Sequence, residues 1–348
     1  MRFNTQILSA ILMGAFSIPG MAGIVNPNIS AIGQVLSGVT DDPGSVNMNE
    51  ATLELGEAEF IMEAALNPYF KGWFTIAAGD EGFEVEEAYG TWVKGLPWGL
   101  GMKAGKYRLG FGKLNPVHPH AYPFQETPGA WSSLMPGEEG FNEVAVQASI
   151  LLPSPGSWAP LFSVDLLQGG GFHPDEEKTA FGWLGRFGNS FLLGDGAALE
   201  AGVSGATGMD HIEEDLRGYL AGGDLKVKFF SPGSSQLTLQ GEGAFRRSHS
   251  VDSVAGVASE DRMGFYAFAD FRYHTQYNAG VLYDQVERAG DPSLVDRTVT
   301  AFVGFAVLEE STLLRAAYSY SMPQGEDGTN ALSLQFIFSM GPHKPHQF

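Results

Sequence analysis

Apolar and polar residues alternate along almost the whole chain, in runs of roughly 9 to 15 residues. In the clearest run, 331–340, Leu332, Leu334 and Phe336 share one face, while Ser333 and Gln335 share the other. Clusters of glycine, proline, asparagine and aspartate separate the runs, and no long segment has the period of a helix. The pattern therefore predicts an all-β protein.

The predicted strands are too long for an ordinary sandwich. A soluble β-sandwich also alternates, but its strands average about 5 or 6 residues. The runs here are close to the 9 to 11 tilted residues that cross a bilayer, and a closed barrel leaves no unpaired edge in lipid. We therefore expect a transmembrane antiparallel β-barrel of about sixteen strands, with a soluble all-β fold as the alternative. The strands are centred near residues 33, 59, 74, 89, 103, 146, 164, 183, 200, 222, 241, 267, 281, 302, 315 and 335.

The chain begins with the pattern of a secretory signal peptide. Arg2 precedes an apolar stretch from Ile7 to Ile18, and small residues then lead to Ala22. We expect residues 1–22 to be a signal peptide, 23–340 one outer-membrane barrel and 341–348 a short C-terminal periplasmic tail. An uncleaved membrane anchor is the alternative, although the apolar stretch is short for a spanning helix of about 20 residues.

The connections between predicted strands alternate in length, which supports a barrel with short periplasmic turns and longer outer loops. The short ones are 67–68, 95–97, 153–156, 231–233 and 308–311. The long ones are 39–49, 109–140, 169–177, 206–215, 248–260, 287–296 and 321–329. The longest, 109–140, is the long third extracellular loop of this arrangement.

Composition narrows the function. The net charge is -20, which excludes a nucleic-acid partner because phosphate binding needs clustered lysine and arginine. There is no cysteine, which removes disulfides, thiol catalysis and thiolate metal sites. The expected partners are the lipid bilayer, lipopolysaccharide and small hydrophilic solutes or ions.

The third outer loop contains two histidines one residue apart, in "GKLNPVHPHAYPFQETPG" (112–129). A loop of this length is usually functional, so we predict a constriction loop that includes His118, His120, Glu126 and Trp131. His118 and His120 also form half of a metal site, completed by Glu126 or by residues 138 and 139, since imidazole and carboxylate suit zinc. Packing or hydrogen bonding within the loop is the alternative. His343 and His346 lie beyond the last predicted strand.

Charged residues on the polar strand faces are predicted to line a water-filled pore and to set its selectivity. The alternative is that opposite charges pair across neighbouring strands and stiffen the wall. The predicted lining residues are Glu57, Glu59, Glu63, Glu87, Lys103, Glu143, Asp165, Arg186, Lys226, Lys228, Glu242, Arg246, Arg262, Asp270, Arg272 and Arg315.

Motifs of enzyme chemistry are absent from the sequence, which has no nucleophile elbow, dinucleotide turn or zinc-protease helix motif. We therefore predict no enzyme activity and no required cofactor. The first hypothesis is an outer-membrane channel for passive passage of small hydrophilic solutes or ions. The second is a receptor or channel linked to zinc or another divalent cation, and the third is a structural barrel without transport.

Three stretches resemble outer-membrane porins of the phosphate-selective-porin-like group: "GFEVEEAYGTW", "GLGMKAGKYRLGFGKLNPVHPH" and "NALSLQFIFSMGPHKPHQF". The strongest resemblance covers about residues 82–120. It implies a sixteen-stranded, trimeric barrel that passes small solutes. Lysine and arginine are too few on the polar faces to carry phosphate selectivity over, so no phosphate-binding residue is implied.

Overall fold

The computed structural model describes residues 27–79, 82–137, 140–173, 179–231, 233–252, 256–307 and 311–341. Almost all of their regular structure is β-strand, as the alternation predicts. The helical segments described are η1 (Pro97–Gly99), η2 (Pro119–Ala121) and α2 (Gly129–Leu134), and no helix in these ranges is long and apolar enough to cross a membrane. The strands are β1 (Asn28–Thr40), β2 (Thr52–Leu55), β3 (Ala58–Ala65), β4 (Phe70–Gly79), β5 (Gly82–Trp92), β6 (Leu100–Arg108), β7 (Asn142–Leu151), β8 (Trp158–Leu167), β9 (Gly182–Leu192), β10 (Ala197–His211), β11 (Leu216–Ser231), β12 (Ser235–Asp252), β13 (Gly256–Tyr273), β14 (Tyr277–Arg288), β15 (Asp291–Ala306), β16 (Thr312–Met322) and β17 (Thr329–Met340).

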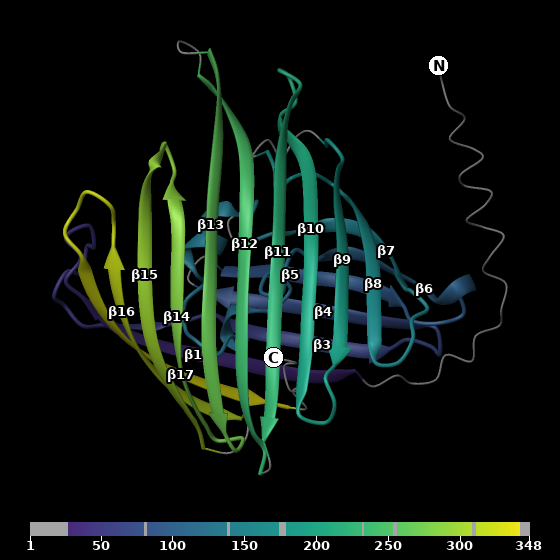
Figure 1. Cartoon of the computed structure of the whole chain (residues 1–348), viewed down its shortest axis with the longest axis horizontal. Coiled ribbons are helices and arrows are strands. Elements are labelled where there is room, and N and C mark those ends of the chain that lie inside the picture. Colours follow the sequence, from purple (N-terminus) through teal and green to yellow (C-terminus); the bar gives the residue numbers. More distant parts are fainter. Residues whose placement is uncertain are drawn as a thin grey trace.

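The strands form one closed antiparallel barrel, whose wall is seen in Figure 1. β1 pairs with both β2 and β3, each strand from β3 onward pairs with the next along the chain, and β17 returns to pair with β1. In that closing pair Ala31 lies opposite Met340 and Thr40 lies opposite Ala331. Closure satisfies the backbone of both terminal strands, so the sheet has no free edge.

The barrel has sixteen strand positions, as predicted. The sheet contains 17 strands, but β2 and β3 both pair with β1 and share one position, which leaves 17 − 1 = 16. Leu55 of β2 lies opposite Val35, whereas Glu59 of β3 lies opposite Ile32. Gly56 and Glu57 interrupt the ladder between them. Each predicted centre falls within its strand.

The two faces of the wall differ in polarity as the alternation predicts. On β13, Met263 and Phe265 are exposed, while Arg262 and Asp270 are buried. The same holds on β17, where Leu334 and Phe336 are exposed and Gln335 is buried. The buried face also carries large apolar side chains. They include Leu184, Leu220, Phe268, Leu282 and Phe302.

Three predicted outer loops are much shorter than expected. The strands continue into 206–215, 248–260 and 287–296, and the pairing runs as far as Asp252 opposite Gly256. In Figure 1 the β12–β13 and β10–β11 hairpins extend above the rest of the wall, while the β14–β15 hairpin ends lower. The prediction failed because glycine, serine and charged residues interrupt the strict alternation in these stretches. The hydrogen-bonded ladder continues after the alternation that reveals it has ended.

The predicted signal peptide and the C-terminal tail lie outside the described residues, apart from Gly341. Strand β17 ends at Met340, opposite Ala31, and Gly341 follows with φ +91°. Phe338, which the sequence suggests as the closing residue of the last strand, pairs with Gly33 two positions earlier.

We expect an arginine on the middle of the outer face to destabilise the barrel in lipid. Val303 of β15 is 54% exposed and lies opposite Ala279 and Ala316. Val303→Arg should lower the free energy of unfolding in lipid vesicles by about 2–4 kcal/mol, because the charge enters the hydrocarbon. Denaturant titration of the refolded protein measures the change.

Val257→Arg is the matched control for this prediction. Val257 is 55% exposed, but it lies near the tip of the β12–β13 hairpin. Its substitution should cost about 0–1 kcal/mol. Equal costs at the two positions would mean that the Val303 face does not lie in hydrocarbon.

Candidate functional site

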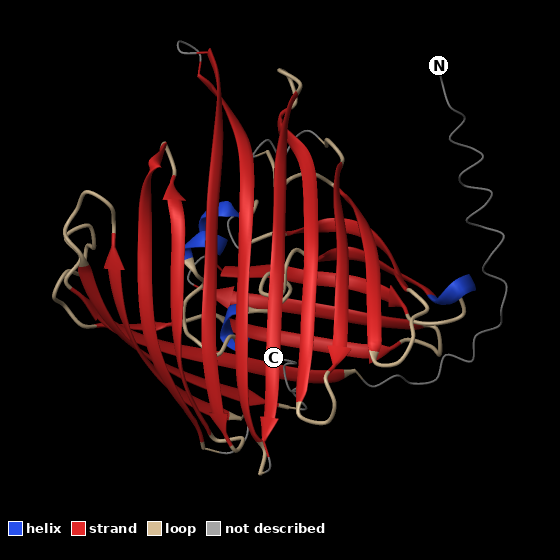
Figure 2. Ribbon diagram, in the orientation of Figure 1, coloured by secondary structure: helices blue, strands red, loops and turns tan. Residues whose placement is uncertain are grey.

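The long connection between β6 and β7 lies inside the barrel. We name residues 109–141 the lumen loop. Its backbone accepts hydrogen bonds from the wall: Arg315 Nη1 donates to His120 O at 3.1 Å, and Arg262 Nη2 donates to Ser133 O at 2.9 Å. In the reverse direction, the Ala130 amide donates to Asp284 Oδ1 at 2.9 Å. Figure 2 shows helical turns of this segment behind the front strands. The loop therefore contacts several sides of the wall.

Aromatic side chains anchor the lumen loop to the inner face. The Phe124 ring meets Phe268 edge-on, with centroids 5.3 Å apart, and it meets Phe302 in the same way at 5.9 Å. Trp131 packs against Tyr266 at 5.3 Å and an interplanar angle of 88°. Burial of each such side chain contributes roughly 1.5–3 kcal/mol. The apolar residues on the inner face are thus the wall's half of an interior core.

Glu242 of β12 holds the start of the lumen loop. Its two carboxylate oxygens accept the backbone amides of Lys113 and Leu114, each at 2.8 Å, and it also accepts the hydroxyl of Tyr266. Gly112 makes this geometry accessible: it has φ +65°, and a Cβ atom there would collide with the Glu242 carboxylate. Only glycine allows the backbone to approach the carboxylate this closely.

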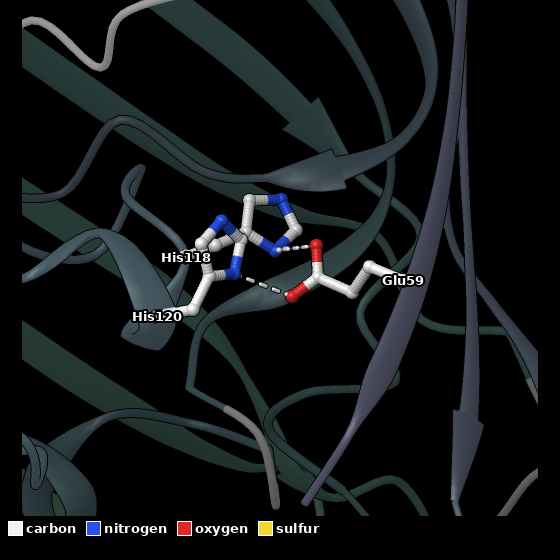
Figure 3. A group of neighbouring side chains, drawn as sticks. All are labelled: Glu59, His118 and His120. Carbon is white, nitrogen blue, oxygen red and sulfur yellow. Dashed lines mark hydrogen bonds and ion pairs between the residues drawn. The ribbon is translucent and has the colours of Figure 1, made fainter. Parts of the chain in front are cut away.

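Two histidines of the lumen loop meet a group of wall carboxylates, of which Figure 3 draws Glu59. His120 Nδ1 lies 2.7 Å from Glu59 Oε1, and His118 Nε2 lies 3.1 Å from Glu87 Oε2. His118 Nδ1 lies 3.5 Å from both Glu59 Oε2 and Glu86 Oε2. All five side chains are buried. We name Glu59, Glu86, Glu87, His118 and His120 the histidine–glutamate cluster.

A β-bulge turns Glu86 toward the lumen. In the pairing of β4 with β5, Thr75 lies opposite Glu87 and Ile76 lies opposite Val85, so Glu86 is an extra residue. Glu86 and Glu87 are both buried although they are adjacent in sequence. Bulges commonly re-aim a side chain in this way. Under strict alternation Glu86 would face away from Glu87, on the same side as Glu84, so the sequence did not predict its inward position.

The carboxylates of the cluster also act on the charge of His118. Burial by itself lowers the pKa of this imidazole. The hydrogen bond with Glu87 and the negative charges of Glu59 and Glu86 outweigh burial, and the net pKa is raised. The surplus of negative charge around His118 therefore favours a cation at this place.

The predicted partners of the histidines were different. Glu126, proposed as a third ligand, is exposed. Among the described residues, the carboxylate that lies with His118 and His120 in a possible metal-binding group is that of Glu59. The other two proposed glutamates, at 138 and 139, lie outside the described residues. Trp131 is buried at 2% exposure.

The sixteen predicted lining residues are all buried or half-buried, and many of them make contacts within the wall. Arg186 binds Asp224 through two hydrogen bonds of 2.7 and 2.9 Å. Asp165 accepts the Tyr107 hydroxyl at 2.7 Å, and Glu143 accepts the Gly169 amide at 2.8 Å. Of these three contacts, the one between Arg186 and Asp224 pairs opposite charges, and it joins β9 to β11 across β10.

Two cavities remain inside the barrel beside the lumen loop. One has a volume of about 430 Å³ and is bordered by Lys226, Lys228, Asp270 and Arg272. The other has about 190 Å³ and is bordered by Glu57, Glu86 and Arg108. Tyr122 borders both cavities and is only 2% exposed. The residual space is therefore divided into a part richer in bases and a part richer in carboxylates, with Tyr122 between them.

Sequence comparison gives little about this chain. No protein-family profile matches it. An uncharacterized protein of Aquifex aeolicus (strain VF5) is 29% identical over 262 residues, which are 67% of this chain and 54% of that protein. The chain thus spans about half the length of this relative.

Solved structures of similar fold are outer-membrane proteins. The outer membrane channel DcaP of Acinetobacter baumannii has a TM-score of 0.62 and 10% identity, covering 93% of this chain and 99% of that one. The anion-selective porin from Comamonas acidovorans has a TM-score of 0.59 and 10% identity, and the match covers 91% of this chain and 100% of that one. The trimer form of OmpT from Vibrio cholerae has a TM-score of 0.57 and 12% identity, and the match covers 90% of this chain and 99% of that one. At these identities the likeness shows a shared porin-like barrel fold.

We expect Gly112→Ala to loosen the lumen loop. The added Cβ collides with the Glu242 carboxylate, and relief requires the loss of its bonds to Lys113 and Leu114. Overpacking of this kind costs about 1–3 kcal/mol, beyond the strain of a positive φ. Denaturant unfolding and limited proteolysis within 112–137 measure the two effects.

Gly194→Ala separates the collision from the backbone strain. Gly194 has φ +67°, but nothing lies within 4 Å of the position of its Cβ. This variant should lose less stability than Gly112→Ala and should leave the lumen loop as protease-resistant as in the wild type. A loss as large as that of Gly112→Ala would remove the Glu242 contact as the cause.

Proposed function

We propose that the chain is a bacterial outer-membrane channel for passive passage of small hydrophilic solutes or ions. The observation that carries the proposal is the division of the wall: exposed apolar side chains cover the outside of a closed barrel, and ionisable side chains line the inside. In lipid, only a closed barrel satisfies the backbone of every strand. The fold shared with proteins described as an outer membrane channel and an anion-selective porin supports the proposal.

The proposed path runs through the two cavities beside the lumen loop, which acts as the constriction. Lys226, Lys228 and Arg272 border the larger cavity, so they are the proposed selectivity residues among the sixteen predicted on the sequence. His118, His120 and Trp131 belong to the constriction by holding the loop in the lumen, while Glu126 contributes an exposed charge. The relation to the phosphate-selective-porin-like group remains part of the proposal, without transfer of phosphate selectivity.

The remaining parts of the chain are proposed to serve export and assembly. Residues 1–22 are a signal peptide, 23–340 the barrel and 341–348 a periplasmic tail. The outer apolar face contacts the lipid bilayer, and acidic rim residues contact lipopolysaccharide through bridging cations.

A second candidate function, a channel linked to a divalent cation, is favoured by the histidine–glutamate cluster. The groups that hold the lumen loop there are also groups that bind such a cation.

Single-channel recording tests the channel. Purified protein in a planar bilayer should give stepwise conductance. Lys226→Glu together with Lys228→Glu should shift the reversal potential toward cation selectivity, changing the permeability ratio roughly twofold or more, because charged side chains along the path set selectivity. Recordings under a salt gradient measure the shift.

Arg247→Glu is the control for this charge reversal. Arg247 is exposed and pairs with Asp261 at 2.6 Å, away from both cavities. Its substitution should leave the reversal potential unchanged. A wild-type barrel that inserts but never conducts would refute the channel and favour a structural barrel without transport.

We also propose a homotrimer, supported by the fold shared with a protein solved in a trimer form. Sedimentation equilibrium of the protein extracted in mild detergent should give three chains per particle. A mass of one chain at all concentrations would refute the trimer and leave the proposed channel untouched.

A further inference from the structure

Three separate segments bring metal-binding groups to one place in the lumen. Glu59 comes from β3, Glu86 from the bulge of β5, and His118 and His120 from the lumen loop. Glu59, His118 and His120 each place one ligand atom within 4.8 Å of the ligand atoms of the other two. Glu57, Glu59 and Glu86 form a second group with the same spacing. Figure 3 shows both imidazole rings turned toward the carboxylate of Glu59.

Three buried atoms at this place have no hydrogen-bond partner. They are His118 Nδ1, Glu59 Oε2 and Glu86 Oε2. The three residues are 8%, 1% and 3% exposed, respectively. An unsatisfied buried polar group is costly, and natural proteins rarely leave several together. Both carboxylate oxygens lie 3.5 Å from His118 Nδ1, so a ligand bound beside this nitrogen would meet unsatisfied oxygens as well.

The two contacts of His118 Nδ1 fit a coordinated ion better than hydrogen bonds, whereas His120 Nδ1 and Glu59 Oε1, 2.7 Å apart, are at hydrogen-bond distance. His118 Nδ1 is 3.5 Å from both Glu59 Oε2 and Glu86 Oε2, which is beyond the usual 2.7–3.2 Å of a hydrogen bond. Ligands about 2.0–2.1 Å from a tetrahedral Zn²⁺ are about 3.3 Å from one another. The gap between these atoms is thus close to the edge of a zinc coordination shell.

The surroundings orient His118 as a ligand. Its Nε2 lies 3.1 Å from Glu87 Oε2, so an imidazole protonated on Nε2 would donate to Glu87 and leave the Nδ1 lone pair for the metal ion, which takes the place of the second proton of the imidazolium. A carboxylate that orients a histidine through the other ring nitrogen is the usual second shell of a metal site. Glu87 therefore has a role distinct from that of Glu86, although the two are neighbours in sequence.

We propose that Glu59, Glu86, His118 and His120 bind one divalent transition-metal ion, zinc by ligand type, which fastens the lumen loop to the barrel wall. Two imidazoles with carboxylates suit zinc, whereas calcium and magnesium prefer oxygen ligands alone. Two carboxylates and two neutral imidazoles around Zn²⁺ make a neutral shell. The site does not depend on whether the barrel conducts.

Metal binding to the intact protein tests the site. Refolded protein, freed of metal with a chelator and titrated with Zn²⁺ in detergent, should bind one equivalent with protection of the lumen loop from protease. His118→Ala with His120→Ala should abolish this equivalent. Glu86→Gln, which keeps the side-chain shape, should weaken binding roughly tenfold or more, since even outer-shell partners contribute about 10–100-fold.

Two control variants remove histidines elsewhere. His249→Ala breaks a 3.0 Å contact with Asp210 on another part of the wall, and His343→Ala with His346→Ala alters the C-terminal tail. Both controls should bind like the wild type. Unchanged binding by the His118/His120 variant, or loss of binding in the tail variant alone, would assign the metal elsewhere and overturn the proposal.

Cobalt gives a readout that does not require the double variant to fold. Co²⁺ in the wild type should show the strong visible bands of a tetrahedral site, and Glu86→Gln should alter them. A wild-type spectrum like that of Co²⁺ in water, or no stoichiometric binding of either metal, would overturn the site. Because binding is measured without conductance, failure of the channel and failure of the metal site are distinguishable.

Discussion

Closure of the backbone hydrogen-bond ladder is the constraint on which the rest of this structure depends. An open sheet of this length exposes unpaired amides and carbonyls at two edges, which cannot be tolerated beside lipid. Pairing of β17 with β1 removes both edges and encloses an interior. Once the wall is closed, the two-residue period of a strand sends every second side chain inward, so the division between an apolar outside and an ionisable inside follows from the chain's alternation.

The enclosed space is filled as a protein interior rather than left as an empty tube. The lumen loop contributes Phe124 and Trp131, and the wall contributes Phe268 and Tyr266 to the same packed cluster. Charged side chains around this packed cluster form hydrogen bonds with backbone groups. Glu242, for example, accepts hydrogen bonds from two backbone amides at the start of the loop. The larger cavity beside the loop has about 430 Å³ and is bordered by bases and carboxylates, among them Lys226, Arg272 and Asp270. These charges therefore lie close to whatever occupies the cavity.

Irregularities of the wall coincide with the histidine–glutamate cluster. The ladder is interrupted between β2 and β3 next to Glu57, and β5 is bulged at Glu86. Each irregularity breaks the two-residue alternation that sends side chains to opposite faces of the sheet. Both lie where carboxylates of the wall approach His118 and His120 in the interior. Local departures from a regular sheet are thus linked to the contacts that hold the lumen loop.

The sequence by itself determined the architecture, because alternation is a local property. It indicated sixteen strands, the polarity of their faces and the rank of the longest loop. It also led to the prediction that this loop is a constriction loop. The tertiary structure alone decided that Phe268 and Phe302 meet Phe124, and that His118 and His120 meet carboxylates from β3 and β5. It also decided the inward turn of Glu86 and the continuation of the tall hairpins. These features depend on pairing between residues far apart in the chain and on register shifts, neither of which leaves a periodic signal in the sequence.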